Sequence, residues 1–170
     1  MNIVLSGFMG SGKTTLAGAL SRELNMRSID IDRYIEEQQG MSTNDIFAEY
    51  GEKAFRDLEH LAVKELCQKD NIIISAGGGT ILNSANTKLL KRNGVVIYLD
   101  VTVETVMRRL ASDHSRPLLQ RDDKESAVTE LLNGRLPIYK AAADVIVDAN
   151  SDDISQKVKD VISKLSLDKK

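Results

Sequence analysis

The stretch that most constrains this chain is GFMGSGKT at residues 7–14, which follows the short apolar run NIVLS. It matches the phosphate-binding pattern G-x-x-x-x-G-K-[ST] in full. Glycines let the backbone N–H groups of such a loop turn toward a phosphate, and the helix that follows points the positive end of its dipole at the same oxygens. The pattern needs a strand before it and a helix after it, and both are expected here. The residues expected to bind a nucleotide in this loop are Gly10, Ser11, Gly12, Lys13, Thr14 and Thr15.

Apolar runs and amphipathic stretches alternate along the rest of the chain. Short strands are expected at residues 2–6, 27–32, 71–75, 95–100 and 144–148. Helices are expected at residues 13–24, in about three pieces over 33–69, and at 84–94, 103–111 and 152–165. This alternation predicts an α/β fold of three layers, α/β/α, around a central and mainly parallel sheet of about five strands. No linker or internal repeat interrupts it, so residues 1–170 are expected to form one domain.

The charge and composition of the chain argue against several classes of partner. Lys and Arg number 23 and Asp and Glu number 25, so the net charge of −2 gives no reason to expect a nucleic acid or a membrane surface. No apolar run approaches the roughly 20 residues that span a bilayer, and no leader is expected before the first strand. The single cysteine, Cys67, excludes an internal disulfide and fits a reducing compartment. We therefore expect a cytoplasmic monomer that binds small molecules.

A magnesium ion that accompanies a nucleotide needs oxygen ligands besides the Thr14 hydroxyl, and acids at strand ends are the candidates. Asp100 follows a buried strand, but it is expected to begin the next helix as a cap-like acid. Asp30 and Asp32 remain. On an extended strand their side chains would point to the same side and face the cleft together. Their carboxylates would repel one another unless a cation such as Mg²⁺ or the Lys13 ammonium lies beside them. Two solvated acids at a strand end are the alternative.

Three further segments carry candidates for an acceptor pocket. Arg56 lies early in an amphipathic helix, Arg135 lies four residues before Tyr139, and the strand at 71–75 runs into three glycines. The glycines remove every side chain from the carboxyl edge of the sheet, which is where ligands of open α/β sheets bind. Taken singly, each arginine is equally compatible with a solvated surface charge, and the glycines with a simple turn. The glycines concerned are Gly77, Gly78 and Gly79.

The segment SDHSRPLLQRDD at residues 112–123 is the irregular part of the chain. It mixes basic and acidic side chains with a proline and has little periodicity. Loops of this kind often close over active sites, and a plain surface loop is the alternative. We expect a mobile lid at about residues 111–124, within which no role is derived for His114.

Together these motifs resemble those of shikimate kinases over nearly the whole chain, in order and at the spacing of that family. The segments that carry the resemblance are the loop at 7–14, the Asp30/Asp32 pair, DIFAEYGEKAFRDLE, the GGG turn, RPLL in the lid and the R-x-x-x-Y segment. The resemblance implies a P-loop kinase fold like that of nucleoside monophosphate kinases, with a substrate-binding helical region at residues 32–60. It also implies transfer of the γ-phosphate of ATP, with Mg²⁺, to the 3-hydroxyl of shikimate on the route to chorismate and aromatic amino acids.

The resemblance further implies a role for each candidate residue. The residues implied to hold shikimate are Asp32, Arg56, Gly77, Gly78, Gly79 and Arg135, with both arginines on its carboxylate. Thr14 and Asp30 are implied to support Mg²⁺. The implied catalytic residues are Lys13, Asp32 and Arg116, with Asp32 taking the hydroxyl proton and Arg116 reaching the phosphates as the lid closes. Arg109 is implied to lie against adenine and Asn150 to contact the nucleotide. Phe47 and Phe55 resemble residues that wall the substrate pocket.

Other functions are weighed against this one. Gluconate kinase and other small-molecule P-loop kinases use the same fold, and gluconate is also a hydroxy acid. A nucleoside monophosphate kinase needs a second base-binding pocket, for which no segment is apparent. A GTPase-type switch needs an N-K-x-D motif, which is absent, and an inactive relative would be expected to lose Lys13, Asp30 or Arg116, all of which are present.

Overall fold

The computed structural model describes residues 1–113 and 116–167, so His114 lies outside the described residues. Its centre is a sheet of five strands in the order β2-β3-β1-β4-β5, in which every neighbouring pair is parallel. The strands are β1 (Asn2–Gly7), β2 (Arg27–Asp30), β3 (Ile72–Ser75), β4 (Gly94–Asp100) and β5 (Val145–Asp148). The predicted five-stranded parallel sheet is therefore confirmed.

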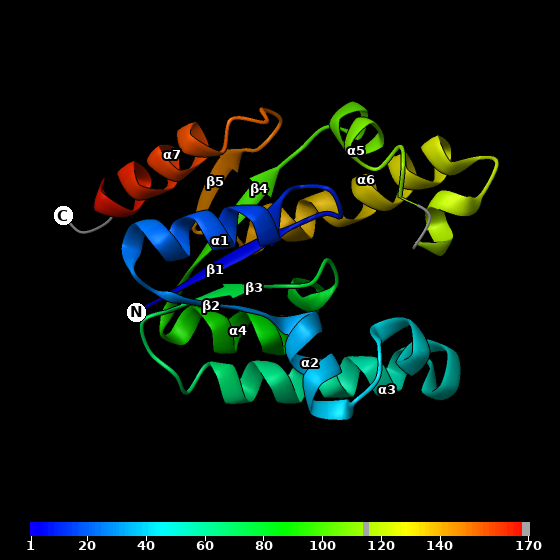
Figure 1. The fold of residues 1–170 in the computed structure, drawn as a ribbon, viewed down its shortest axis with the longest axis horizontal. Helices are drawn as coiled ribbons and strands as arrows, with labels where there is room; N and C mark the ends of the chain where they lie inside the picture. The colour runs from blue at the N-terminus through cyan, green and yellow to red at the C-terminus, as the bar shows by residue number, and fades with distance from the viewer. Residues whose placement is uncertain (114–115, 168–170) are drawn as a thin grey trace.

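Helices cover both faces of this sheet (Figure 1). The helices are α1 (Lys13–Leu24), α2 (Ile31–Gln39), α3 (Thr43–Leu66), α4 (Ser84–Arg92), α5 (Val103–Arg109), α6 (Lys124–Ala142) and α7 (Ile154–Leu167), with short 3₁₀ turns η1 (Thr80–Leu82) and η2 (Pro117–Gln120). Successive residues of β1 point to opposite faces. Leu5 belongs to a buried cluster with Leu16 of α1, whereas Val4 belongs to a second cluster with Leu66 of α3. The centre of the sheet is thus buried on both faces, as is typical of an all-parallel sheet.

Three local predictions about element boundaries are wrong. The second strand ends at Asp30, which caps α2 by accepting a hydrogen bond from the Arg33 backbone N–H at 3.1 Å, so Asp32 lies in the first turn of a helix. Gly94 does not end α4 but begins β4, where a Cβ atom would lie 2.7 Å from the Leu90 carbonyl oxygen. Asp100 does not cap α5, because the Thr102 side chain accepts the capping hydrogen bond.

The region between β2 and β3 forms about three helical pieces, as predicted. The helix α2 ends at Gly40, and α3 is broken at Gly51, whose φ of 86° lies in the left-handed region. The helix α6 is absent from the sequence-based expectations, because Gly134 and Pro137 both lie inside it and both disfavour helix. This helix is important for the site because it carries Arg135.

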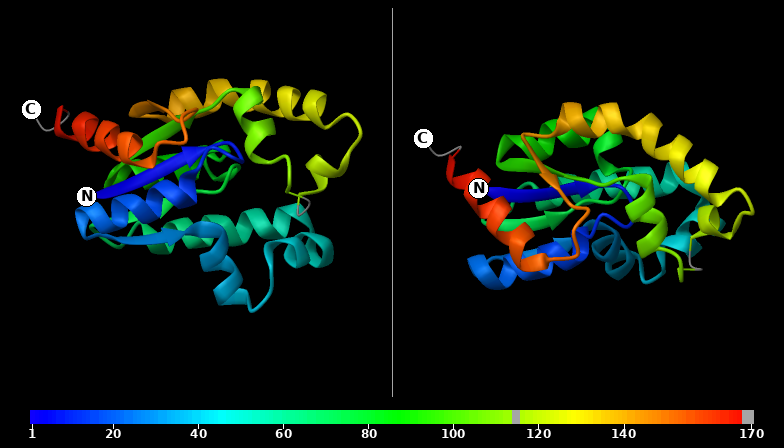
Figure 2. Two further views of the ribbon diagram at one scale, coloured as in Figure 1. Left: turned by 45° about the horizontal axis from the view of Figure 1, so that its top comes forward. Right: turned by 90° about the horizontal axis from the view of Figure 1, so that it is seen from above.

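The two further views in Figure 2 show α5, η2 and the start of α6 together. They lie beyond the carboxyl ends of the strands, on the side of the sheet where the glycine loop follows β1. The segment between α5 and α6 is the region predicted to be a lid. Within the described residues, no helix combines the length and apolar character needed to cross a bilayer.

Candidate active site

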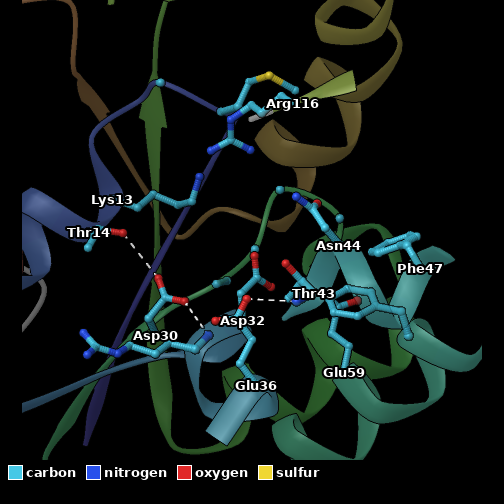
Figure 3. Close-up of a pocket in the computed structure, with 18 of the residues that line it drawn as sticks. Lys13, Thr14, Asp30, Asp32, Glu36, Thr43, Asn44, Phe47, Glu59 and Arg116 are labelled. Atoms are coloured by element: carbon cyan, nitrogen blue, oxygen red, sulfur yellow. Dashed lines mark hydrogen bonds between the residues drawn. The ribbon is translucent and has the colours of Figure 1, made fainter. Parts of the chain in front are cut away.

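A cavity of about 790 Å³ lies at the carboxyl edge of the sheet. Its size is typical of pockets that bind small ligands. It is bordered by the glycine loop after β1, the start of α2, the middle of α3, the turn after β3, the segment before α6, and α6 itself. Figure 3 shows the side chains from several of these elements pointing toward one another. The predicted site residues that line it are Gly10, Gly12, Lys13, Thr14, Thr15, Asp30, Asp32, Arg56, Gly77, Gly78, Gly79, Arg116 and Arg135.

The glycine loop holds the Lys13 ammonium over its own backbone. The ammonium donates hydrogen bonds to the carbonyl oxygens of Gly7 at 2.7 Å and Phe8 at 3.1 Å. Gly10 and Gly12 have φ values of 75° and 88°, which side chains rarely adopt, so the loop requires glycine at both. Burial lowers the pKa of Lys13 to about 8, and the nearby positive charge of Arg116 acts in the same direction. An anion in the loop would relieve this concentration of positive charge.

Thr14 and Asp30 come together beneath the loop. The Thr14 hydroxyl donates to the Asp30 carboxylate at 3.3 Å (Figure 3). A hydroxyl and a carboxylate are oxygen ligands of the kind Mg²⁺ prefers. No group of three or more His, Cys, Asp or Glu side chains that could hold a metal occurs among residues 1–113 and 116–167. The Thr14 and Asp30 oxygens fit a magnesium ion that would take its remaining ligands from water and from nucleotide phosphates.

Asp32 lines the cavity, as predicted, but strand alternation was the wrong reason for expecting it there. It does so from the first turn of α2 rather than from an extended strand. Its carboxylate lies beside the glycine turn, because a Cβ atom on Gly77 would be 3.0 Å from its Oδ1. Burial, followed by the negative charges of Asp30 and Glu59, raises the pKa of Asp32 to about 6. The Asp32 carboxylate therefore takes up a proton at a pH closer to neutral than an ordinary aspartate does.

Glu59 is a residue of the site that sequence reasoning missed. It is 1% exposed, and its carboxylate accepts from Arg56 Nη1 at 2.9 Å and from the Thr80 hydroxyl at 2.8 Å. A buried charge must be paired, and Glu59 fixes the Arg56 guanidinium at the cavity wall. The signal for it was the F-R-x-x-E spacing, which places Glu59 one helical turn after Arg56.

The glycine turn allows both arginines to approach the cavity. A Cβ atom on Gly79 would lie 2.4 Å from Arg56 Nη1, and one on Gly78 would lie 3.3 Å from Arg135 Nη1. The turn is also fixed from α6, since the Tyr139 hydroxyl donates to the Gly78 carbonyl oxygen at 2.6 Å. The arginines from α3 and α6 therefore meet at one bare stretch of backbone.

An aromatic pair and the segment before α6 complete the cavity wall. Phe47 and Phe55 lie with their ring centroids 4.6 Å apart, and both line the cavity. Arg116 lines it from the opposite side, next to Lys13 (Figure 3). The Arg116 side chain is 48% exposed and pairs with Asp113 at 3.3 Å. It is therefore held less firmly than Arg56.

Three predicted nucleotide-binding residues do not line the cavity. Ser11 is 1% exposed within the loop. Arg109 donates to the carbonyl oxygens of Gly10 at 3.0 Å and Ala149 at 2.7 Å, so it joins the glycine loop to the loop after β5. Asn150 accepts from the Thr102 backbone N–H at 2.9 Å and so fixes the start of α5. Their contacts with a nucleotide stay predictions.

The fold and the site define a P-loop kinase that acts on a small molecule: a phosphate loop at the first strand–helix turn borders a cavity that Arg56 and Arg135 also line. The family model described as shikimate kinase matches residues 9–166. The chain belongs to the shikimate kinase family, whose members transfer phosphate to a hydroxyl of shikimate.

Individual relatives agree with this assignment. A shikimate kinase of Caldicellulosiruptor bescii is 44% identical over 82% of this chain and 81% of its own. One of Sulfurihydrogenibium is 39% identical over 96% of this chain and 97% of its own. Among solved structures, the shikimate kinase of Acinetobacter baumannii in complex with shikimate has a TM-score of 0.93 at 33% identity, covering 99% of this chain and 94% of that chain.

Proposed function

We propose that this protein transfers the γ-phosphate of MgATP to the 3-hydroxyl of shikimate, with the residues of the cavity in the roles set out below. The observation that carries the proposal is that Lys13, Arg56 and Arg135 line one cavity. A phosphate donor and a carboxylate-bearing acceptor therefore both have cationic side chains to bind them within one cavity, which Asp32 also lines.

Arg56 and Arg135 are the proposed seat of the shikimate carboxylate. A guanidinium presents parallel N–H donors to a carboxylate, which fixes both the position and the orientation of the acceptor. The bare backbone of the glycine turn lets the ring approach between them, and the Phe47–Phe55 pair offers an apolar wall. The acceptor hydroxyls would then face Asp32 and the phosphate loop.

Asp32 is proposed to orient the attacking hydroxyl and to take its proton. A carboxylate whose pKa is raised to about 6 is a better proton acceptor than an ordinary one and is still mostly ionised at neutral pH. Phosphoryl transfer passes through a loose transition state, so positioning and charge neutralisation are the main tasks of the protein. Lys13 and Arg116 supply positive charge on two sides of the phosphate that moves.

Thr14 and Asp30 are proposed to hold the magnesium ion, Thr14 by its hydroxyl and Asp30 through water. When bound, the ion bridges phosphate oxygens and neutralises their charge. Asp30 is well placed for this because its second oxygen caps α2 and fixes the orientation of the carboxylate.

The lid at about residues 111–124 is proposed to close over the bound substrates. Closure would bring Arg116 onto the phosphates and exclude water, which would otherwise compete as the acceptor. We also propose that the protein acts as a monomer. A cytoplasmic location is proposed from its single, unpaired cysteine.

A coupled assay of ADP release tests the proposed acceptor. Shikimate, gluconate and AMP are compared at equal concentration with ATP and Mg²⁺. We expect turnover with shikimate alone. Turnover with gluconate at a comparable kcat/KM would instead support the alternative hydroxy-acid kinase, and turnover with AMP would contradict the absence of a second base pocket.

A further inference from the structure

Lys157 is a buried cation for which the phosphotransfer proposed above has no use. It lies in the first turn of α7 and is 3% exposed, although lysine side chains are almost never fully buried unless they are paired. Among residues 1–113 and 116–167, no group forms a hydrogen bond or ion pair with its ammonium. Two carboxylates act on it electrostatically, and both are engaged elsewhere: Asp152 pairs with Arg108 and Arg109, and Asp153 accepts from the Gln156 backbone N–H at 3.0 Å.

The ammonium of Lys157 lies at the glycine loop. Its Nζ is 3.9 Å from the position that a Cβ atom on Gly12 would take. Gly12 is the N-cap residue of α1, and α7 packs alongside α1 (Figure 1). On the other side, Arg109 joins the glycine loop to the loop after β5. Lys157 is therefore placed between the phosphate loop and the segment that is expected to receive the adenine.

This placement is unfavourable in the empty protein. The N-terminal end of α1 carries a positive partial charge, which repels the Lys157 ammonium beside it. Burial lowers the pKa of Lys157, and the charge of Arg109 adds to this effect, with Asp152 and Asp153 opposing it. An unpaired buried ammonium persists only where something else compensates it. A bound anion next to Gly12 is the partner that this arrangement lacks.

We propose that Lys157 binds the nucleotide, and that its ammonium pairs with the phosphate nearest the adenosine, the α-phosphate of ATP or ADP. The inference rests on the proposed placement of the nucleotide in the loop at residues 7–14. It adds a residue from α7 to that site. The ammonium then gains a charged partner in the place where the empty protein offers none.

Lys157→Met tests the proposal because it keeps the length of the side chain and removes its charge. ADP binding is measured by calorimetry and the midpoint of thermal unfolding by scanning calorimetry. We expect the Kd for ADP to rise about tenfold, a loss of about 1.4 kcal/mol, while the KM for shikimate stays within twofold. We also expect the empty variant to unfold at the same temperature as the wild type or higher, since an unpaired buried charge has been removed. A lysine with a purely structural role would give the opposite change in stability and no change in ADP binding.

Three further variants make the outcome decisive. Lys159→Met removes an exposed charge from the same helix and should leave both measurements unchanged. Lys157→Gln should reproduce the weaker ADP binding of Lys157→Met. Lys13→Met tests the placement of the nucleotide itself. If Lys13→Met weakens ADP binding and both Lys157 variants bind ADP as the wild type does, the inference is wrong. If Lys13→Met also leaves ADP binding unchanged, the proposed placement of the nucleotide in the loop at residues 7–14 is wrong, and the inference about Lys157 is wrong with it.

Discussion

Replacing Asp32 with Asn should make the empty protein more stable while abolishing its activity. The pKa of Asp32 is raised from 3.8 to about 6, so the folded state disfavours the ionised form that the unfolded chain accepts freely. A difference of about 2.2 units corresponds to about 3 kcal/mol of destabilisation at pH above 6. Asn has almost the same shape and carries no charge, so it should recover much of this free energy. For a chain of this length the gain raises the unfolding midpoint by about 8 °C.

The pH dependence identifies the cause of the gain. Because the folded-state pKa is the higher one, the penalty is fully present above pH 6, is about half as large near pH 5, and vanishes below pH 3.8. Urea unfolding of wild type and Asp32→Asn at pH 7.5 and pH 5 should therefore show a difference that shrinks by about half. The exposed Asp57, which pairs with Lys53 on the surface, supplies the control variant Asp57→Asn, with an expected change within about 0.5 kcal/mol at both pH values.

Two results would refute this reasoning. A variant that is less stable than the wild type at pH 7.5 would mean that the Asp32 carboxylate is stabilised by its surroundings rather than strained by burial. A gain that is the same at pH 5 and pH 7.5 would mean that packing, and not charge, is responsible. The assays are run without Mg²⁺ or nucleotide, because a cation near Asp30 would offset the penalty and hide it.

Three further substitutions test the proposed roles of cavity residues. Arg116→Ala should lower kcat about a thousandfold and leave the KM for ATP within about threefold, because the arginine acts mainly on the transferring phosphate; steady-state rates near those of the wild type would discard that role. Arg135→Lys should raise the KM for shikimate about tenfold with little change in the KM for ATP, since an ammonium cannot reproduce a planar pair of donors; equal changes in both constants would argue against the assignment. Gly79→Ala places a methyl group 2.4 Å from Arg56 Nη1, so the guanidinium must move and the KM for shikimate should rise about tenfold without loss of cooperative unfolding. An unchanged KM in Gly79→Ala would show that Arg56 need not hold its present position.

The layers of the fold could be predicted because each strand is a run of apolar residues with a clear boundary. NIVLS and the run before the three glycines admit few other interpretations than buried strands. The phosphate-loop motif between β1 and α1 also requires a strand followed by a helix, the unit from which parallel sheets are built. The helix α6 could not be predicted in the same way, since Gly134 and Pro137 oppose its local preference. It is stabilised by tertiary contacts, including the stacking of Tyr139 on Tyr98 with centroids 5.3 Å apart.

The residues of the site were predicted better than the reasons for their positions. Asp30 and Asp32 were expected to face the cavity because of strand alternation, yet one is a helix cap and the other lies in the first helical turn. The capping preference of Asp competes with strand extension, and periodicity alone does not decide between them. The F-R-x-x-E spacing places Glu59 next to Arg56, but its burial and its bond to the Thr80 hydroxyl depend on the folded chain and cannot be predicted from that spacing.

The order of strands in the sheet has a consequence for synthesis of the chain on the ribosome. The strand β1 pairs with β3 and β4. The phosphate loop that follows β1 is therefore not supported by a sheet until residues 72–75 and 94–100 have emerged. At about 5–20 residues per second, the nascent chain spends several seconds with a strongly apolar strand and no neighbour for it. The phosphate loop is thus synthesised well before the strands that support it, and during that interval the apolar β1 strand is exposed to aggregation or to a chaperone.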